Sequence, residues 1–508
     1  MTTYKLDYPM SIGILSILIA ATQANNRLVP LNTPDSPQPS KAMSPSYVCN
    51  EHNSALMVVI ISFAAFSGAM MQSLVVPLLA AFPSLLHTDV STVSWLITGL
   101  LISGAVSNVV FGRLGDIYGK RQMILLCLIF LIVGSLIGAV TNDIGWLIFA
   151  RILQGAAIAV VPLGISCLAE FLKGRTLVRG ISLVSAMVGV GASLGFVLSA
   201  LVAQYLDWHY LFALSALLGA IAFIGVHKVF PYRPGVSGQS FDIVGALGLA
   251  IGLCCLLLGI SKGYQWGWSS IKTWSFLIAG LLVLAAWFKN QLSKINPLVD
   301  LRTAMRPAIL LTNFATILIG FSMYGIVLTQ PMVIQLPTAL GYGLGLSVLA
   351  AGLSFIPGGF ISLILPVVAS NLSTRFGART TVLLGGISMA LGYLLLIFWH
   401  ASLFQLIFGS IFVAIGTTLC YGTVPLVILA NTPGNETGQA TGINNLARSI
   451  GTSSSIAFSV AVMATVNTTL SSQVYPDEQS LTIIYATSSI TSLMICVAML
   501  FVSAGTRK

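Results

Sequence analysis

Charged side chains that could do chemistry are concentrated in one ten-residue segment, residues 112–121. Only 7% of the whole chain is Asp, Glu, Lys or Arg, but four of these ten positions are charged: Arg113, Asp116, Lys120 and Arg121. The glycines of the segment, which permit a turn with close backbone approach, are Gly112, Gly115 and Gly119. Because apolar stretches flank it, the segment predicts a charged turn that holds two membrane helices in a set relation.

Asp116, the acid of this segment, predicts a contact with a helix N-terminus. Such an end presents unpaired N–H groups and partial positive charge, so a docked aspartate gains roughly 0.3–2 kcal/mol. On the topology given below, an apolar span at 438–465 begins on the same side of the membrane. We expect Asp116 to dock there, with Lys120, Arg121 and Glu170 completing the network. For Arg113, Lys120 and Arg121, simple anchoring of a loop at the membrane surface is an equal alternative.

Arg151 is the only clear charge well inside a predicted span. Placing it there costs at least ~2.5 kcal/mol, which implies a partner or a function. Gln154 follows three residues later and shares its helix face. The alternative is an arginine that extends to the outer membrane edge, because the span begins only a few residues earlier.

Acidic residues are missing from the middle of every predicted span. A buried acid would suit a cationic substrate, so we expect one that is neutral, anionic or a weakly basic amphiphile. Five neutral polar residues could line its cavity, although each alone could be a helix contact: Gln72, Asn313, Tyr324, Gln330 and Tyr421.

Composition predicts an all-α polytopic membrane protein. The chain is 56% hydrophobic with a mean hydropathy of +0.95, and most of it consists of apolar runs near the roughly 20 residues that span a bilayer. From residue 55 onward we count fourteen candidate spans, among them 93–111, 145–169 and 438–465. The metal-pyrophosphate site of a membrane-embedded transferase would need clustered acids, and a Walker loop is missing, so neither an enzyme nor an ATP-driven pump is expected.

Basic residues predict the orientation of these spans. Outside the spans, nearly all Lys and Arg residues from Arg113 onward fall in turns on the side of the 112–121 segment, and Arg448 is counted with them. The opposite side has only Lys262 and Lys272. Positive residues favour the cytoplasmic side, so both chain ends are predicted to be cytoplasmic in a cell (inner or plasma) membrane. The net charge of +10 then reflects loops that face anionic lipid, with no nucleic-acid partner.

The chain divides into five predicted parts. Residues 1–54 read as a disordered tail, rich in Pro and Ser at 32–46, or as an upstream extension if translation starts at Met43. Residues 55–230 form a six-helix bundle, 231–305 two inserted helices and a linker, 306–504 a second six-helix bundle, and 505–508 a cytoplasmic tail.

A weak internal repeat supports the two bundles. Residues 116–121 are echoed at 374–379, and residues 147–150 at 406–409, each in the same place of a six-helix block. Duplicated bundles with a substrate site between them are typical of rocking transporters.

The motifs resemble the major facilitator superfamily. Residues 112–121 look like its motif between helices 2 and 3, and Leu147, Arg151, Gln154 and Gly155 resemble its helix-4 motif. The two extra central helices resemble those of its fourteen-helix drug:proton antiporter branch. There are two departures: Ile117 stands where the superfamily usually has a basic residue, and the glycines Gly191 and Gly195 lack the proline of the usual antiporter motif.

The resemblance implies a function. Asp116 would favour the outward-open state, and Arg151, Gln154 and Gly155 would take part in proton coupling or substrate binding. The implied protein is a monomeric, cofactor-free exporter of small organic molecules, driven by the proton gradient through alternating access. The alternative is a facilitator or symporter of an organic metabolite.

Overall fold

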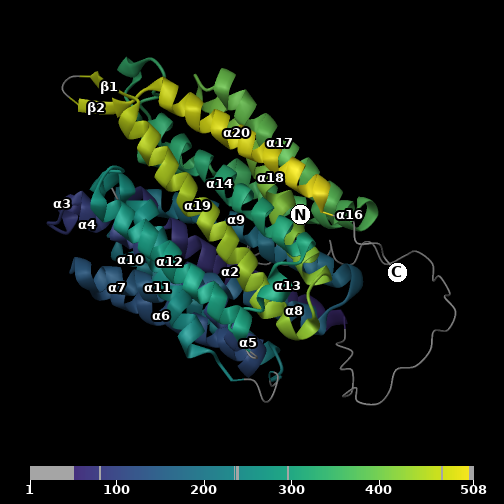
Figure 1. Cartoon of the computed structure of the whole chain (residues 1–508). Helices are drawn as coiled ribbons and strands as arrows, with labels where there is room; N and C mark the ends of the chain where they lie inside the picture. The colour runs from purple at the N-terminus through teal and green to yellow at the C-terminus, as the bar shows by residue number, and fades with distance from the viewer. Residues whose placement is uncertain are drawn as a thin grey trace, which may run out of the picture. The chain divides into compact units, whose positions relative to one another are not determined.

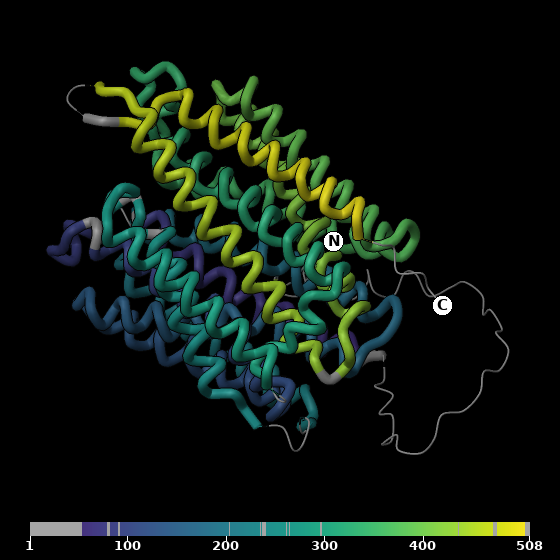
Figure 2. The backbone as a smooth tube through the Cα atoms, in the orientation of Figure 1, coloured from purple at the N-terminus to yellow at the C-terminus, as the bar shows by residue number. Residues whose placement is uncertain are grey.

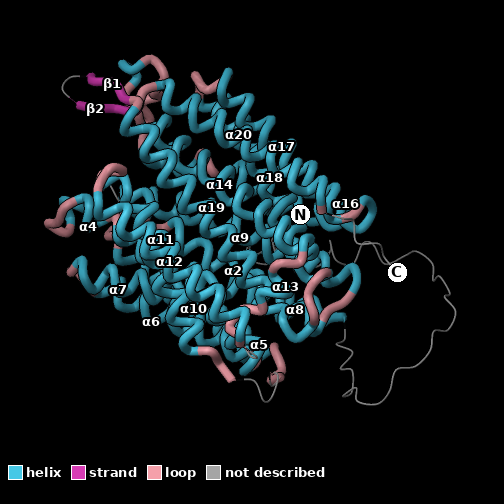
Figure 3. Tube along the Cα trace, in the orientation of Figure 1, coloured by secondary structure: helices cyan, strands magenta, loops and turns pink. Residues whose placement is uncertain are grey.

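The computed structural model describes residues 51–78, 82–233, 235, 240–294, 297–470 and 473–502. Within them, fourteen helices are long and apolar enough to cross a membrane, from Asn53–Leu78 to Glu478–Phe501, which confirms the predicted number and all-helical class. Figure 3 shows helix almost throughout, with one small pair of strands. The predicted tails at 1–54 and 505–508 lie almost wholly outside the described residues.

The long helices are α2 (Glu51–Ser73), α5 (Trp95–Tyr118), α6 (Lys120–Val140), α7 (Ile144–Gly155), α8 (Val160–Phe171), α9 (Gly174–Tyr205), α10 (His209–Val229), α11 (Ile243–Trp266), α12 (Ile271–Ser293), α14 (Pro307–Gln335), α16 (Ile356–Phe376), α17 (Ala378–Phe398), α18 (Leu403–Ala430), α19 (Thr437–Thr465) and α20 (Glu478–Phe501) (Figure 1). Helices α7 and α8 together make one of the fourteen spans, Ile144–Phe171. The short ones are η1 (Val76–Leu78), α3 (Phe82–Leu85), α4 (Val90–Val93), η2 (Ala156–Ala159), α13 (Leu301–Ala304), η3 (Thr338–Leu340), α15 (Val348–Leu353) and η4 (Gly434–Glu436). Strands β1 (Asn467–Leu470) and β2 (Gln473–Pro476) pair antiparallel between α19 and α20.

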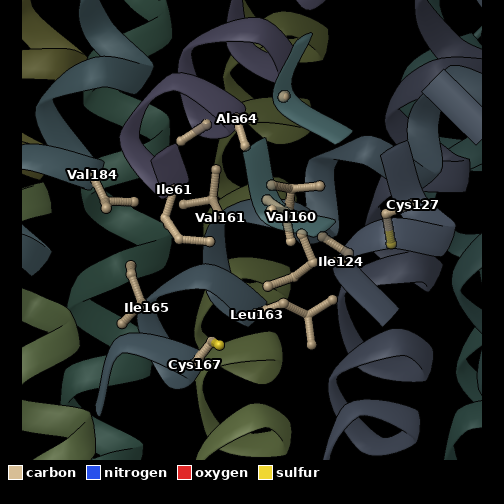
Figure 4. Packing of buried hydrophobic residues seen from close by; sticks show 14 of the residues in the cluster. Ile61, Ala64, Ile124, Cys127, Val160, Val161, Leu163, Ile165, Cys167 and Val184 are labelled. Carbon is tan, nitrogen blue, oxygen red and sulfur yellow. The ribbon is translucent and has the colours of Figure 1, made fainter. Parts of the chain in front are cut away.

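Apolar side chains from the first helices form one continuous core. Ile61 of α2, Ile124 of α6 and Leu163 of α8 are fully buried in it, and Val184 of α9 joins them (Figure 4). Further cores form among α14, α17, α18 and α20. Helix α19 packs on α5 and α8 of the first group and on α14 of the second. Figure 2 shows its tube running beside α14.

The 112–121 segment is more helical than the sequence indicates. Helix α5 continues through it to Tyr118, so the predicted turn is wrong for Gly112 and Gly115. The chain reverses only at Gly119, whose φ of +104° favours glycine. Gly377 has φ +89° at the corresponding junction of α16 and α17, where the sequence places the echo of this segment.

The pair α11 and α12 is held by a buried carboxylate. Asp242, just before α11, accepts hydrogen bonds from the Gly245 N–H (2.8 Å) and from Gln291 Nε2 (2.7 Å), and it pairs with Lys294. Gln291 Oε1 in turn accepts from the Val299 N–H at 3.2 Å. Burial opposes ionisation, but Lys294, Gln291 and the Gly245 N–H hold the pKa of Asp242 below its ordinary 3.8.

Replacing Asp242 by asparagine should destabilise this region. A lowered native pKa means that the carboxylate adds stability above the ordinary value and loses it as pH falls through the lowered one. At pH 7 we expect D242N to melt roughly 2–4 °C below the wild type in detergent. The difference should shrink as pH falls below about 4. Melting points that stay equal at pH 7, or a gap that persists in acid, would contradict the assignment; K294Q should give part of the neutral-pH loss.

Candidate gating contact and buried polar residues

Two glycines let α5 approach its neighbours closely. A Cβ on Gly112 would lie 2.6 Å from the Gly438 carbonyl oxygen of α19, and one on Gly115 would lie 2.6 Å from Leu163 of α8. Real Cβ atoms do not come so close. The backbone contact requires glycine at Gly112, whereas at Gly115 the end of the flexible Leu163 side chain would have to move. At the turn, a Cβ on Gly119 would lie 2.5 Å from the Arg233 carbonyl oxygen.

Asp116 is docked on the start of α19. Its Oδ1 accepts a hydrogen bond from the Gly438 N–H at 3.0 Å, and its Oδ2 accepts one from the Gln439 N–H at 2.8 Å. The side chain is only 5% exposed. The first N–H groups of a helix have no partner inside it, so the carboxylate satisfies two of them and meets the positive end of the helix. The expected contact between residues 322 positions apart is present.

Lys120 completes this junction. Its ammonium lies 2.6 Å from Glu170 Oε1 and 3.6 Å from Asp116 Oδ1, and it donates to Thr437 Oγ1 at 2.7 Å. It thus joins α6, α8, α5 and α19, and it is 3% exposed. Arg113 is also buried and adds positive charge near Asp116. A buried charge needs such partners, so mere anchoring does not account for Lys120.

Arg121 lies apart from this network. Its Nη2 donates to the His227 carbonyl oxygen at 2.8 Å, near the end of α10. Arg379, its echo in the repeat, donates in the same way to the Leu500 carbonyl oxygen near the end of α20, at 2.7 Å. An arginine that caps the last carbonyls of a helix also meets the negative end of the helix dipole. The structure therefore places Arg121 in a cap shared by both halves of the repeat.

The sequence did not predict a second set of polar contacts between the helices, farther along α19 than the contact with Asp116. Asn445 of α19 donates to Asn108 Oδ1 of α5 at 2.7 Å, and Thr441 donates to the Pro162 carbonyl oxygen at 3.1 Å. A Cβ on Gly442 would lie 2.2 Å from the Asn108 carbonyl oxygen. The signal was present: these residues share one face of α19, whose span has the lowest hydropathy of the fourteen, 1.2.

Arg151 is enclosed among the first helices at 1% exposure. It donates to the Met71 carbonyl oxygen, the Leu96 carbonyl oxygen and Gln154 Oε1 at 3.1, 3.1 and 2.9 Å. Met71 lies in the last turn of α2, where carbonyls lack helical partners, so the guanidinium caps that end. Gln154 Nε2 in turn donates a hydrogen bond to Ser135 Oγ of α6 at 2.8 Å. The side chain does not reach the surface, which excludes the predicted alternative of extension to the membrane edge.

Comparison with known proteins assigns the family. Residues 61–456, well over half of the chain, match the Major Facilitator Superfamily. The chain belongs to this superfamily. It is 25% identical over 403 residues to the tetracenomycin C resistance and export protein of Streptomyces glaucescens, covering 77% of this chain and 72% of that one. It is 27% identical over 431 residues to the quinolone resistance protein NorB of Staphylococcus aureus, covering 83% and 91%.

The fold agrees with this assignment. The solved superfamily proton:xylose symporter XylE superposes with a TM-score of 0.61 at 14% identity, over 89% of this chain and 97% of that one. The resemblance named from the sequence is thus confirmed. The chain is a multi-pass membrane transporter of the Major Facilitator Superfamily, and its family is one of transporters, not enzymes.

The remaining predicted residues have mixed surroundings in this superfamily member. Gly155 adjoins η2, and a Cβ there would lie 2.7 Å from the Leu100 carbonyl oxygen, so its role in the structure is packing. Gln330 is fully buried and donates to Ser354 Oγ at 2.8 Å. Asn313 accepts from Asn444 at 2.9 Å. Gln72 and Tyr324 are partly exposed, near the end of α2 and in the second half of α14.

One basic residue was placed wrongly. The charge count assigns Arg448 to a cytoplasmic turn, but it lies inside α19, eleven residues after Thr437. At the helical rise that is about 16 Å along the axis. Its guanidinium carbon lies 4.3 Å from the ring centroid of Tyr421. Arg151 is therefore not the only charge deep within a span.

Proposed function

We propose that this protein is a secondary active exporter of small organic molecules, of the fourteen-helix drug:proton antiporter type. The observation that carries the proposal is the buried junction of Asp116 and Lys120 with the start of α19, which ties the two ends of a duplicated helical bundle together. Such a junction suits a transporter that must close one side of the membrane while the other is open. The names of the relatives, which include antibiotic export and resistance proteins, support export as the direction.

In this proposal the junction is the cytoplasmic gate. When it is formed, α5 and α8 are held against α19, and a substrate can leave only on the opposite side. Opening it exposes the carboxylate of Asp116 and two helix N–H groups, so each cycle breaks two charge-assisted hydrogen bonds. Both chain ends would then be cytoplasmic, in the cell membrane, with a monomer as the working unit and no cofactor.

The proton gradient would supply the energy. We assign Arg151 a role in coupling through its permanent positive charge and not through proton transfer, because an arginine does not release its proton in proteins. With Gln154 and Ser135 it connects α7 to α2, α5 and α6, so it can transmit a change in one helix to the others.

Transport in proteoliposomes tests this function. Purified protein is reconstituted with an acidic lumen, and uptake of fluorescent antibiotics, quinolones included, is followed with time. Antiport predicts accumulation against the concentration gradient, and a protonophore should abolish it. Equilibration that ignores the pH gradient would instead favour a facilitator, which the missing proline near Gly195 keeps as the alternative.

A further inference from the structure

Arg448 has no counter-ion in the part of the chain that the structure describes. Among the described residues, no ion pair includes it, and no carboxylate lies in the middle of a membrane span. Arg151 donates to two backbone carbonyls and an amide oxygen and leaves only Nη2 without a partner, whereas the Nε of Arg448 is buried without a hydrogen-bond partner and its guanidinium faces the Tyr421 ring. A charge this deep normally has a partner or a function.

The side chain of Arg448 is only partly buried. A guanidinium that faced lipid at this depth would cost several kcal/mol, which favours contact of its accessible part with polar groups between the helices over contact with lipid. Arg448 also shares α19 with the residues that meet Asp116, and its backbone packs so closely on α14 that a Cβ on Gly320 would lie 2.4 Å from its carbonyl oxygen.

The walls around this cation are aromatic and polarisable. Tyr421 of α18 lies beneath the guanidinium, and its hydroxyl donates to Met323 Sδ of α14 at 3.0 Å. Tyr324 follows on α14 and is partly exposed. Farther along the same two helices, ten residues beyond Arg448 and so about 15 Å along α19, Phe458 lies 5.7 Å from Phe321 of α14, centroid to centroid. Three helices thus combine one positive charge with flat apolar surface.

We propose that Arg448 and Tyr421 form a subsite that binds the anionic group of an aromatic substrate, such as a carboxylate. A guanidinium can hold a carboxylate through two parallel hydrogen bonds, and the Tyr421 ring keeps the guanidinium in place by a cation–π contact. The substrate's ring packs on the aromatic side chains of α14. This inference rests on the proposed function and narrows its substrate class from neutral, anionic or weakly basic compounds to anionic ones.

Binding by the purified full-length protein in detergent tests the subsite. Three probes share one ring system and differ in charge: naphthalene-2-carboxylate, naphthalene-2-carboxamide and 2-naphthylmethylammonium. Their dissociation constants are measured by microscale thermophoresis. The wild type should bind the carboxylate at least about tenfold more tightly than the amide, as expected for charge-assisted hydrogen bonds.

Variants identify the residue responsible. In R448Q the dissociation constants of the carboxylate and the amide should lie within about twofold of each other. R448K keeps the charge but loses the two parallel N–H donors of the guanidinium, so its preference for the carboxylate should lie between those of R448Q and the wild type. The matched control is R375Q, since Arg375 also lies over an aromatic ring, 5.2 Å from Phe376, but at the end of α16. It should bind all three probes as the wild type does. Melting points of each variant show that it is folded.

Other outcomes overturn the proposal. They are a wild type that binds none of the probes, one that prefers the cation, or an R448Q variant that keeps the carboxylate preference. Proteoliposome transport separates this result from the proposed function. If the wild type accumulates drug but R448Q still discriminates, the subsite fails and the exporter stands. If discrimination depends on Arg448 but no compound is moved, the subsite stands and the exporter fails.

Discussion

Replacing Asp116 by asparagine is expected to lower gradient-driven transport by about tenfold to hundredfold, because the charge-assisted bonds to α19 are worth roughly 1.5–3 kcal/mol. The substitution keeps the size of the side chain. Its amide can still accept from one of the two N–H groups, but its NH₂ would face the other, and the attraction to the helix dipole is lost. The proposed gate would therefore open too readily.

Hydrogen exchange of the backbone reports directly on the junction that is proposed as the gate. In D116N the amides at the start of α19, including Gly438 and Gln439, should exchange faster, while the core of Figure 4 should be unchanged. Faster exchange with lower transport locates the defect at the junction. Unchanged exchange together with normal transport would show that Asp116 has no gating role.

Asp300 provides a matched control. It also accepts hydrogen bonds from two N–H groups at a helix start, those of Arg302 (2.9 Å) and Thr303 (3.4 Å), but within the short helix α13. D300N therefore removes the same kind of carboxylate-to-N–H hydrogen bond, but from a cap within one short helix. We expect its transport to remain within about twofold of the wild type, since a lost cap costs only about 1 kcal/mol of local stability.

Hydropathy predicts the membrane-spanning helices of this chain well, because a bilayer imposes the length and the apolar character of each one. It fails where helices continue beyond the apolar region. Glycine and charge at 112–118 look like a turn, but the helix persists to Tyr118 because Gly112 and Gly115 face other helices, where their missing side chains permit close packing.

The site is only partly visible in the sequence. Asp116 could be paired with the start of α19 because a carboxylate gains from the positive end of a helix, and the predicted topology starts the 438–465 span on the same side of the membrane. The hydrogen bond between Asn108 and Asn445 could not be predicted, since nothing in the local sequence fixes how two helices are rotated relative to each other. Arg448 was misplaced because the positive-inside rule counts basic residues without their depth.

Replacing Arg151 by methionine is expected to destabilise the protein by about 2–4 kcal/mol, because it removes the cap from the end of α2 and leaves buried oxygens without donors. Methionine has a similar length, so packing is largely kept. Thermal unfolding in detergent should rank the wild type above R151K and R151K above R151M. Lysine keeps the positive charge near the Met71 carbonyl but cannot also reach Leu96 and Gln154 in the fixed geometry of a guanidinium.

Ser135 offers a graded control at the far end of the same network. S135A removes only the acceptor for Gln154 Nε2, so its loss should be about 1 kcal/mol. Transport per folded molecule then decides between the roles of Arg151. If its fixed charge contributes to coupling, R151K should retain part of the response to a pH gradient and R151M should lose it. If R151M keeps a full response once corrected for its folded fraction, the arginine acts on stability alone.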